Sequence, residues 1–437
     1  MVEFSPEHTP VIIDGVRTPF MRSHKAYVSL RSCDLGRLAI SGLMDRLGIA
    51  GETIEHVSMG TVLHDPHTPN IARESVLAAG LSARVPAHTV SLACISSNMA
   101  ATQIADMIRL QRISIGIAGG VDTCSDPPIR LSPNFRRALV RWQKIRKPAQ
   151  MLPELRRLKN FEFADLALDA PSVAEFSNGK TMGEGCEILA QRVGVSRAEA
   201  DHYAARSHAL AIKGQQEKFF TDNIIPVQLP PAFGTIEQDD GPRADTTEEK
   251  LAKLSPAFDR TFGVNTAGNS SFLTDGASAM LMMSLQKAKD LGYRARAILV
   301  DHVYAAGDVL SEMLSGPAFT IPLLLKRNKL KISDIGVWEI HEAFASQMVA
   351  NLKLIASKSF AQERLGLSEA AGEIPLDKLN VYGGSLSIGH PFGATGVRLL
   401  FTATKRMEQE GARYAVVSGC AAGGHGSAIL LANPQVL

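Results

Sequence analysis

Cys94 lies in a segment whose residue types favour nucleophilic chemistry at sulfur. Residues 90–98 (VSLACISSN) run from apolar, strand-like positions through the cysteine into small polar residues, and a helix is expected to continue to Arg109. Unpaired N–H groups and the positive dipole end at a helix start stabilise a thiolate, which is the nucleophilic form. An isolated cysteine is also common as small core filler. The segment alone therefore leaves a catalytic and a structural role open.

His390 lies in a glycine-rich turn, residues 389–396 (GHPFGATG). Pro391 fits the first turn of a helix, and the glycines allow close approach of the backbone, so His390 is expected at the mouth of the turn. Such a histidine can accept the proton of a thiol or polarise a carbonyl oxygen. The alternative is a histidine bonded only to its own turn.

Two further segments place reactive side chains next to strands. In residues 418–426 (SGCAAGGHG), small neighbours let a substrate reach the sulfur of Cys420 and leave N–H groups free for a developing oxyanion. His425 is expected to be a supporting hydrogen-bonding residue. In residues 339–345 (EIHEAFA), His341 and Glu342 mark a strand-to-helix junction, where a role in a cleft and a capping or ion-pair role are equally open.

Apolar runs alternate with longer amphipathic segments along most of the chain, which predicts an α/β protein with buried strands. The rhythm occurs twice, and each copy has a helix that begins near a special residue, Cys94 or His390, and leads into a strand that ends in small residues. The sequence therefore predicts two similar halves. The expected boundaries are 1–124 and 256–290 for the N-terminal half, 125–255 for an inserted loop domain, and 291–437 for the C-terminal half.

The insertion contains a strongly basic stretch. Residues 130–159 hold ten Lys or Arg against one acidic residue, Glu154, with apolar residues interleaved, which favours a basic amphipathic helix or helix pair. It can be a solvated face packed on its own domain. It can equally dock on anionic lipid, on a partner subunit or on acyl-CoA phosphates.

Composition excludes several other classes. The 437 residues, 45% of them hydrophobic, can bury a large core, and a net charge of +2 gives no general attraction for nucleic acid. Five scattered cysteines without CxxC pairs argue against a disulfide scaffold and a zinc site, so no metal is expected. The N-terminus lacks targeting features, which suggests a cytoplasmic protein or a processed mature chain of the mitochondrial matrix, and no transmembrane run is present.

The four segments together resemble the active-site motifs of the thiolase family. The resemblance extends over nearly the whole chain and includes residues 16–20 (VRTPF), 118–122 (AGGVD) and 266–277 (TAGNSSFLTDGA). It implies a five-layered αβαβα fold of two halves with a loop domain over a coenzyme A (CoA) site. It also implies cleavage of 3-ketoacyl-CoA by CoA, with CoA as a substrate and no cofactor.

Carried over from the family, Cys94 is the nucleophile that receives the acyl group, and His390 activates it. Cys420 is the acid and base for the acetyl-CoA enolate and the incoming CoA thiol. The N–H groups of Cys94 and Ala422 form an oxyanion hole. Many thiolases have glycine at the position of Ala422, but only the N–H is required.

His341 departs from most of the family, which has an asparagine there that orients a water molecule. Histidine at this position, and the long basic insertion, resemble the β subunits of trifunctional fatty-acid-oxidation complexes. This resemblance implies an α subunit with hydratase and dehydrogenase activities as partner, contact of residues 130–159 with a partner or a membrane surface, and a homodimer.

The family pattern also assigns CoA contacts. Ser271 is expected to bind the pantetheine, Arg243 and Phe258 to lie near the nucleotide, and Met182, Ala343 and Phe344 to line the pantetheine tunnel. Some short-chain biosynthetic members have a histidine where this chain has Thr181, so their CoA contacts do not transfer directly.

Three alternative functions remain open at this stage. A biosynthetic acetoacetyl-CoA thiolase runs the same chemistry toward condensation. A ketoacyl synthase shares the fold, but typically uses one cysteine and two histidines, and Cys420 argues against it. A non-catalytic lipid-carrier or scaffold subunit would not need Cys94.

Overall fold

The computed structural model describes residues 5–158, 168–169, 171 and 174–436. Its N-terminal half contains a sheet with strands in the order β4-β3-β5-β10-β1. β3 is parallel to β4 and β5, whereas β10 is antiparallel to β5 and β1. The strands are β1 (Pro10–Arg17), β3 (His56–Gly60), β4 (Ala87–Val90), β5 (Ile115–Asp122) and β10 (Thr274–Ser284), and β2 (Met21–Arg22) pairs with the end of β10.

The C-terminal half repeats this order as β12-β13-β14-β11. Here β12 is parallel to β13, and β14 is antiparallel to both β13 and β11, so each strand has a counterpart in the first half. The strands are β11 (Ala297–Ala306), β12 (Val337–Ile340), β13 (Tyr414–Ala421) and β14 (His425–Ala432). β1 and β11 join the two sheets through the pairs Val11–Ile298 and Ile12–Ala297. The predicted duplication is confirmed.

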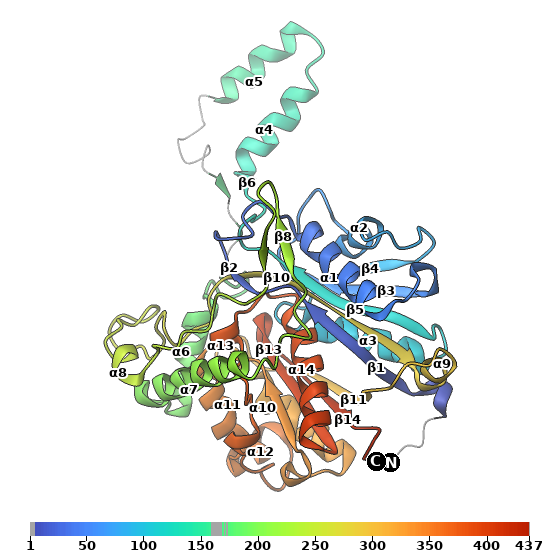
Figure 1. Cartoon of the computed structure of the whole chain (residues 1–437). Helices are drawn as coiled ribbons and strands as arrows, with labels where there is room; N and C mark the ends of the chain where they lie inside the picture. The colour runs from blue at the N-terminus through green and yellow to red at the C-terminus, as the bar shows by residue number, and fades with distance from the viewer. Residues whose placement is uncertain (1–4, 159–167, 170, 172–173, 437) are drawn as a thin grey trace.

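Helices cover and separate the two sheets, as Figure 1 shows. One hydrophobic cluster packs helices α1 and α2 on the outer face of the first sheet, a second packs α3 and α14 between the sheets, and a third packs α10 and α11 on the outer face of the second. These helices are α1 (Ser32–Leu47), α2 (Ile71–Ala78), α3 (Ser96–Arg109), α10 (Gly316–Asn328), α11 (Ala345–Ile355) and α14 (Thr395–Glu410). The predicted five-layered αβαβα arrangement is therefore confirmed.

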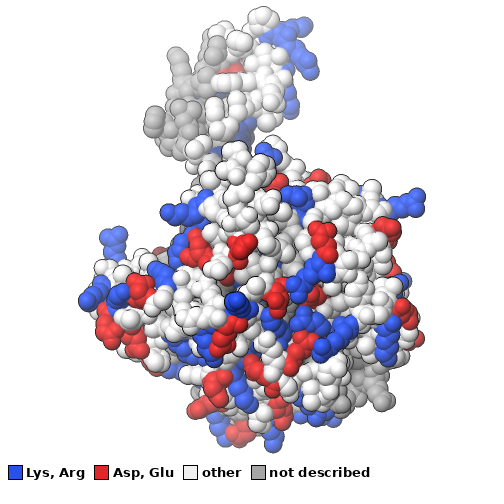
Figure 2. All heavy atoms as spheres, in the orientation of Figure 1, with Lys and Arg blue, Asp and Glu red and all other residues white. Residues whose placement is uncertain are grey.

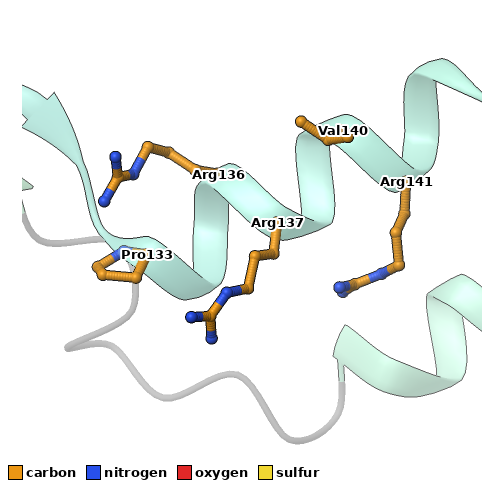
Figure 3. A pocket seen from close by; sticks show the side chains of 5 residues that line it. All are labelled: Pro133, Arg136, Arg137, Val140 and Arg141. Carbon is orange, nitrogen blue, oxygen red and sulfur yellow. The ribbon is translucent and has the colours of Figure 1, made fainter.

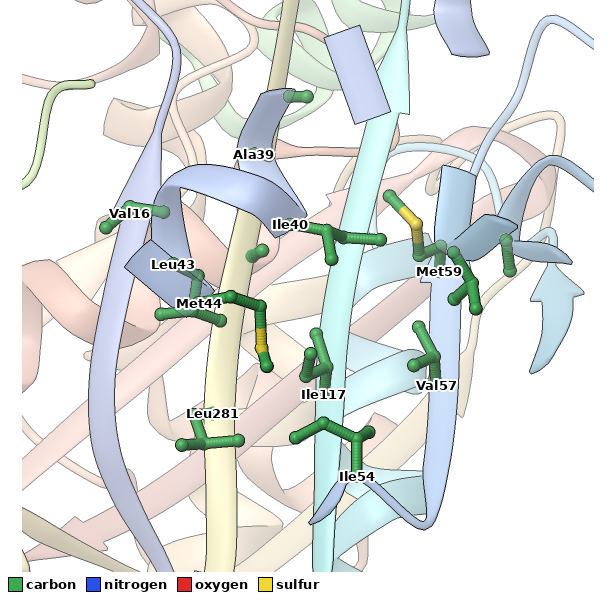
Figure 4. Packing of buried hydrophobic residues seen from close by; sticks show 14 of the residues in the cluster. Val16, Ala39, Ile40, Leu43, Met44, Ile54, Val57, Met59, Ile117 and Leu281 are labelled. Carbon is green, nitrogen blue, oxygen red and sulfur yellow. The ribbon is translucent and has the colours of Figure 1, made fainter. Parts of the chain in front are cut away.

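Helix α1 illustrates how the sequence sets a layer. Leu35, Ala39, Ile40 and Leu43 recur at helical spacing and are fully buried. Figure 4 shows this stripe facing the side chains of the sheet strands beneath it. The helix ends at Gly48, whose φ of 60° is readily adopted by glycine.

A long segment between β5 and β10 lies outside the two sheets. Two helices of this segment, α6 and α7, lie against α11 of the C-terminal half. The elements here are β6 (Arg130–Leu131), α4 (Pro133–Gln143), α5 (Met151–Leu158), β7 (Leu168–Asp169), α6 (Met182–Val193), α7 (Arg197–Gln216), β8 (Val227–Leu229), β9 (Gly234–Ile236) and α8 (Glu248–Leu251). The remaining helices are α9 (Leu285–Asp290), α12 (Lys358–Leu365) and α13 (Ser385–Ile388). Among the described helices, none is long and apolar enough to span a bilayer.

The basic stretch forms an arm, defined here as β6, α4, α5 and β7, that projects from the body (Figure 1). The predicted helix pair is confirmed. Glu154 of α5 pairs with Arg141 of α4 and with Arg157, which ties the two helices together. The last residue of the basic stretch, Lys159, lies outside the described residues.

Candidate active site

Cys94 occupies a tight turn between β4 and α3. The preceding residue, Ala93, has a φ of 44°, a left-handed conformation that costs a non-glycine residue on the order of 1–2 kcal/mol. The Ser96 hydroxyl supports the turn, since it accepts the Leu92 N–H at 2.8 Å and donates to the Ala93 carbonyl at 2.6 Å. The turn directs the sulfur into the interior between the two halves.

The resting sulfur of Cys94 is a thiol. Burial raises its pKa to about 12, and the backbone N–H groups of Ala422 and of Cys94 itself lower it only in part. The structure thus differs from the expectation that the helix start holds a thiolate, because loss of hydration outweighs the local N–H groups. The N–H groups expected to form the oxyanion hole thus lie close enough to the sulfur to influence its pKa.

His390 lies in the loop between α13 and α14, directly before Pro391. The expectation that Pro391 opens a helix is wrong, since α14 begins only at Thr395. The His390 N–H donates to Thr274 Oγ1 at 2.9 Å, and its Nδ1 lies 2.7 Å from Thr395 Oγ1. A further anchor is Asp122 at the end of β5, which accepts the Gly393 N–H at 2.5 Å. Both halves therefore position this loop.

His341 follows β12 immediately and is also buried. Its Nδ1 lies 2.9 Å from Ser385 Oγ, and the Ser385 hydroxyl accepts a hydrogen bond from Arg398 at 3.2 Å. Burial and the nearby Arg398 charge lower the pKa of His341 to about 3. Burial, then His341 and Arg398, lower the pKa of His390 well below its ordinary value. Both rings are uncharged at neutral pH.

Cys420 is the seventh residue of β13 and is fully buried. Its side chain packs with Cys186, Ala343 and Phe344 in one hydrophobic cluster. Burial, followed by the nearby sulfurs of Cys94 and Cys186, raises its pKa well above the ordinary value of a thiol. Cys420 therefore holds a proton at rest, as an acid must.

The structure brings these side chains together although they are far apart in sequence. The Cys94 sulfur and ring nitrogens of His341 and His390 lie within 4.8 Å of one another, and the two rings are 4.0 Å apart between centroids. Three such atoms could all contact one soft metal ion. The adjacent guanidinium of Arg398, however, opposes a cation as it opposes protonation of the histidines.

Most of the expected CoA-binding residues form a second group beside this site. Met182, Ala343 and Phe344 pack in the cluster that contains Cys420. The Ser271 N–H donates to the Ala343 carbonyl at 2.9 Å, and the ring of Phe258 lies 5.8 Å from that of Phe344. Phe258 is 37% exposed and lines a surface cavity of about 550 Å³ together with Lys180, Arg260 and Phe262.

Arg243 lies apart from that cavity. It is exposed, its N–H donates to Nδ1 of His208 on α7 at 3.2 Å, and its charge helps to lower the pKa of Arg22. Two guanidinium groups thus lie close together here. Arg22 was not singled out from the sequence because its neighbour is more than two hundred residues away.

Four buried residues that support the site were also missed: Asp122, Ser385, Thr395 and Arg398. Each of them supports the site by a hydrogen bond to another residue of the site or of its loops. No local sequence pattern distinguishes a serine, threonine or arginine that has such a supporting role. Asp122 and Thr395 do lie in the segments 118–122 and 389–396 noted above, and Ser385 lies five residues before His390.

Comparison with known proteins agrees with this geometry. The model of the thiolase N-terminal domain matches residues 10–286, and that of the thiolase C-terminal domain matches residues 293–433. The chain belongs to the thiolase family. It is 44% identical over 422 residues to the mitochondrial trifunctional enzyme subunit beta of Rattus norvegicus, which covers 96% of this chain and 87% of the relative.

Other thiolases are similar over comparable lengths. A probable 3-ketoacyl-CoA thiolase of Caenorhabditis elegans is 44% identical, with 96% of this chain and 93% of the relative covered. A 3-ketoacyl-CoA thiolase of Yersinia enterocolitica is 42% identical, with 96% of each covered. The crystal structure of the Bacillus anthracis acetyl-CoA acetyltransferase has a TM-score of 0.82 and 28% identity, with 98% of this chain and 99% of that one covered.

Proposed function

We propose that this chain is a 3-ketoacyl-CoA thiolase of fatty-acid β-oxidation, which cleaves 3-ketoacyl-CoA with CoA into acetyl-CoA and a shortened acyl-CoA. The observation that carries the proposal is the convergence of Cys94, His341 and His390 within 4.8 Å, next to the buried thiol of Cys420. Thiolysis requires a sulfur nucleophile, a separate acid and hydrogen-bond donors for oxyanions.

In the first half-reaction, His390 accepts the proton of the Cys94 thiol as the sulfur attacks the keto carbon. The bond between C2 and C3 then breaks, which leaves the acyl group on Cys94 and expels the enolate of acetyl-CoA. Cys420 donates its proton to the enolate carbon and becomes a thiolate. Neutral starting groups suit this sequence, because each proton moves only when a bond forms or breaks.

In the second half-reaction, the Cys420 thiolate accepts the proton of the incoming CoA thiol. The CoA sulfur attacks the thioester, whose oxygen is stabilised by the N–H groups of Cys94 and Ala422, and the protonated His390 returns its proton to the departing Cys94 sulfur. All protons are then restored. His341 assists by stabilising the negative charge on the thioester oxygen of the enolate.

CoA is placed along the group formed by Met182, Ser271, Phe258, Ala343 and Phe344. The 550 Å³ cavity offers the aromatic faces of Phe258 and Phe262 to an adenine ring, and the cations Lys180 and Arg260 to phosphates, alongside the carboxylates of Glu184, Glu187 and Asp259. Arg243, with Arg22 beside it, offers a further phosphate contact. The steps above balance without a resident cofactor, since CoA is consumed as a substrate.

The test is thiolysis of short-, medium- and long-chain 3-ketoacyl-CoA, with acetyl-CoA measured as the product. Cys94→Ala should lower turnover by at least about 10³-fold, because the acyl-enzyme can no longer form. Cys33→Ala, which removes a thiol outside the site, is the matched control and should retain turnover. Unchanged activity of the Cys94 variant would favour a scaffold subunit.

A second candidate is a biosynthetic acetoacetyl-CoA thiolase, favoured by the similarity to the Bacillus anthracis acetyl-CoA acetyltransferase. The same substrate series separates the two. Activity confined to acetoacetyl-CoA would support the biosynthetic function, whereas thiolysis of longer chains supports β-oxidation.

The partners follow from the same proposal. The relatives named as trifunctional enzyme subunit beta point to an α subunit that supplies 3-ketoacyl-CoA, and a homodimer of this chain is expected. The corresponding compartments are the mitochondrial matrix or the bacterial cytoplasm. Co-purification with a larger subunit, and light scattering of the isolated chain, test the two assemblies.

The arm is the proposed peripheral membrane contact. Arg137 and Arg141 project from one side of α4 and Arg136 from another, around a cavity of about 520 Å³ that also includes Val140 (Figure 3). Lys and Arg predominate among the charged atoms visible on the arm (Figure 2). Exposed apolar side chains, Val140, Met151 and Leu152, accompany these charges, as on helices that lie at a lipid interface.

A further inference from the structure

Ser385 lies between a permanent cation and a site histidine. It is the first residue of α13, and both it and Arg398 of α14 are fully buried. Arg398 Nη2 donates to the Ser385 hydroxyl at 3.2 Å, and the same oxygen lies 2.9 Å from Nδ1 of His341. A guanidinium can only donate hydrogen bonds. The hydroxyl proton therefore has to be directed elsewhere.

The acceptor for that proton is Nδ1 of His341. Among the described residues, the Ser385 hydroxyl has hydrogen-bond contacts with Arg398 and His341 only, and a buried hydroxyl proton without an acceptor is costly. A nitrogen that accepts the proton carries a lone pair. The ring proton of neutral His341 then resides on Nε2.

His390 has the opposite arrangement. Its Nδ1 lies 2.7 Å from Thr395 Oγ1, and that hydroxyl donates its own proton to the Pro391 carbonyl at 2.9 Å. Thr395 can therefore only accept from the ring, so Nδ1 of His390 carries the proton. Nε2 of His390 is left with the lone pair that a base requires.

Both Nε2 atoms are buried and have no hydrogen-bond partner among the described side chains. The rings are 4.0 Å apart between centroids, and one nitrogen of each ring lies within 4.8 Å of the Cys94 sulfur. The site thus presents two similar imidazole rings, of which His390 offers an acceptor at Nε2 and His341 a donor at Nε2. Burial, with the nearby charge of Arg398, lowers the pKa of both rings and keeps them neutral, so the difference between them persists at neutral pH.

We infer that Ser385, held by Arg398, is a positioning residue that fixes the proton of His341 on Nε2 and so makes this ring a neutral hydrogen-bond donor to the substrate's thioester oxygen. The inference rests on the proposed thiolase function for the identity of that oxygen. The assignment of the proton itself depends only on the contacts of Ser385, His341 and Arg398.

A double-mutant cycle tests the functional part. Ser385→Ala frees His341 to adopt the other tautomer and should lower kcat roughly tenfold, with a small change in KM, because a transition-state donor is weakened. In a His341→Asn background, the side-chain amide donates without help from Ser385. There, Ser385→Ala should change kcat by less than about twofold. Equal losses in the two backgrounds would overturn the inference.

Two further variants separate positioning from stability. Ser385→Thr keeps the hydroxyl and should restore most of the activity lost in Ser385→Ala. Ser387→Ala removes another buried hydroxyl from α13, one that contacts Ser207 rather than His341, and should leave kcat within about twofold. A loss in Ser387→Ala equal to that in Ser385→Ala would indicate a merely structural role for α13.

Nitrogen NMR of the ¹⁵N-histidine-labelled protein reads the tautomers directly and needs no turnover. His341 signals are assigned by their absence in His341→Asn, and His390 serves as the internal reference for the opposite state. The native protein should show His341 protonated on Nε2, and Ser385→Ala should shift the proton toward Nδ1. Protonation on Nδ1 in the native protein would overturn the inference, even if the thiolase assignment stood.

Discussion

His341 and His390 are buried side by side, and burial lowers the pKa of each ring in the folded protein. In the unfolded chain, both histidines regain an ordinary pKa near about 6.5. Below that pH the unfolded chain binds more protons than the folded one, so acidification favours unfolding. The stability that the two neutral histidines contribute is fully present above about pH 6.5 and is lost as the pH falls below that value.

We predict a corresponding shift in urea unfolding. Each histidine should lower the free energy of unfolding by about 1.4 kcal/mol per pH unit, or roughly 2 kcal/mol between pH 6.5 and pH 5. Urea midpoints at pH 7.5, 6.5 and 5.0 measure the effect. His341→Asn should reduce the fall in the free energy of unfolding with pH by the part that this histidine contributes. His67→Asn, at an exposed position, should leave that fall unchanged. An identical slope in native protein and His341→Asn would contradict the prediction.

Among single residues, the sequence predicted the side chains proposed to react but not those proposed to set their protonation. Cys94, His390 and Cys420 are preceded or followed by small residues and turns, which is a local pattern. Ser385 matters because of its hydrogen bond to His341, more than forty residues away, and Arg398 because it donates to the Ser385 hydroxyl. The thiol form of Cys94 was also not predictable, because it depends on burial by the other half of the molecule.

Among the elements, β5 and the loop that holds His390 bring the two halves into close contact. A Cβ added at Gly120 would lie 1.9 Å from the Gly393 carbonyl oxygen, which is far inside contact distance. Two residues further along the same strand, Asp122 accepts the Gly393 N–H. The absence of a side chain at Gly120 therefore lets the strand and the loop meet.

Gly120→Ala should displace the loop and lower thiolysis by about 100-fold or more, because a shift of about 1 Å in a catalytic group has that effect. Gly116→Ala on the same strand is the matched control: its Cβ would meet only side-chain atoms of Ile104 and Ile113, at 3.1 Å, and activity should be retained. Circular dichroism checks that both variants fold. Native turnover in Gly120→Ala would show that the loop adapts.

Elements with β-branched residues were predicted well, and the central strand β10 was not. The strand before His341, β12, and the helix after His390, α14, were both expected, because apolar residues recur there with a clear period. β10 is rich in Ala, Ser and Met and is buried along its whole length, so it has neither alternation nor strong strand propensity. Its place between β5 and β1 is set by tertiary pairing.

For the whole molecule, the distribution of charge is more informative than its sum. The net charge is +2, yet ten of the 46 Lys and Arg residues fall within residues 130–159, the stretch from which the arm begins. The proposed attraction of the arm to an anionic bilayer would therefore be local. It should weaken with salt, because exposed charges are screened within about 8 Å at physiological ionic strength.

We predict that the protein binds vesicles containing anionic phospholipid and not vesicles of neutral lipid. Replacing Arg137, Lys144 and Lys147 with alanine should weaken this binding by about 3 kcal/mol, at about 1 kcal/mol for each charge, and leave thiolysis unchanged. Alanine at Arg84, Lys253 and Lys331, three exposed cations of the body, is the matched control. Vesicle co-sedimentation measures both. Equal binding of the two triple variants would exclude the arm.

The pairing of β6 with β7 brings the chain back to where it departed, with Arg130 opposite Asp169 and Leu131 opposite Leu168. Because the two ends of the arm lie side by side, the arm can be removed or replaced without a change in the fold of the body. A short hairpin turn grafted between Leu131 and Leu168 would close the gap. Such a truncated enzyme would be a freely diffusing version of the protein, in which attachment and turnover are separated by design.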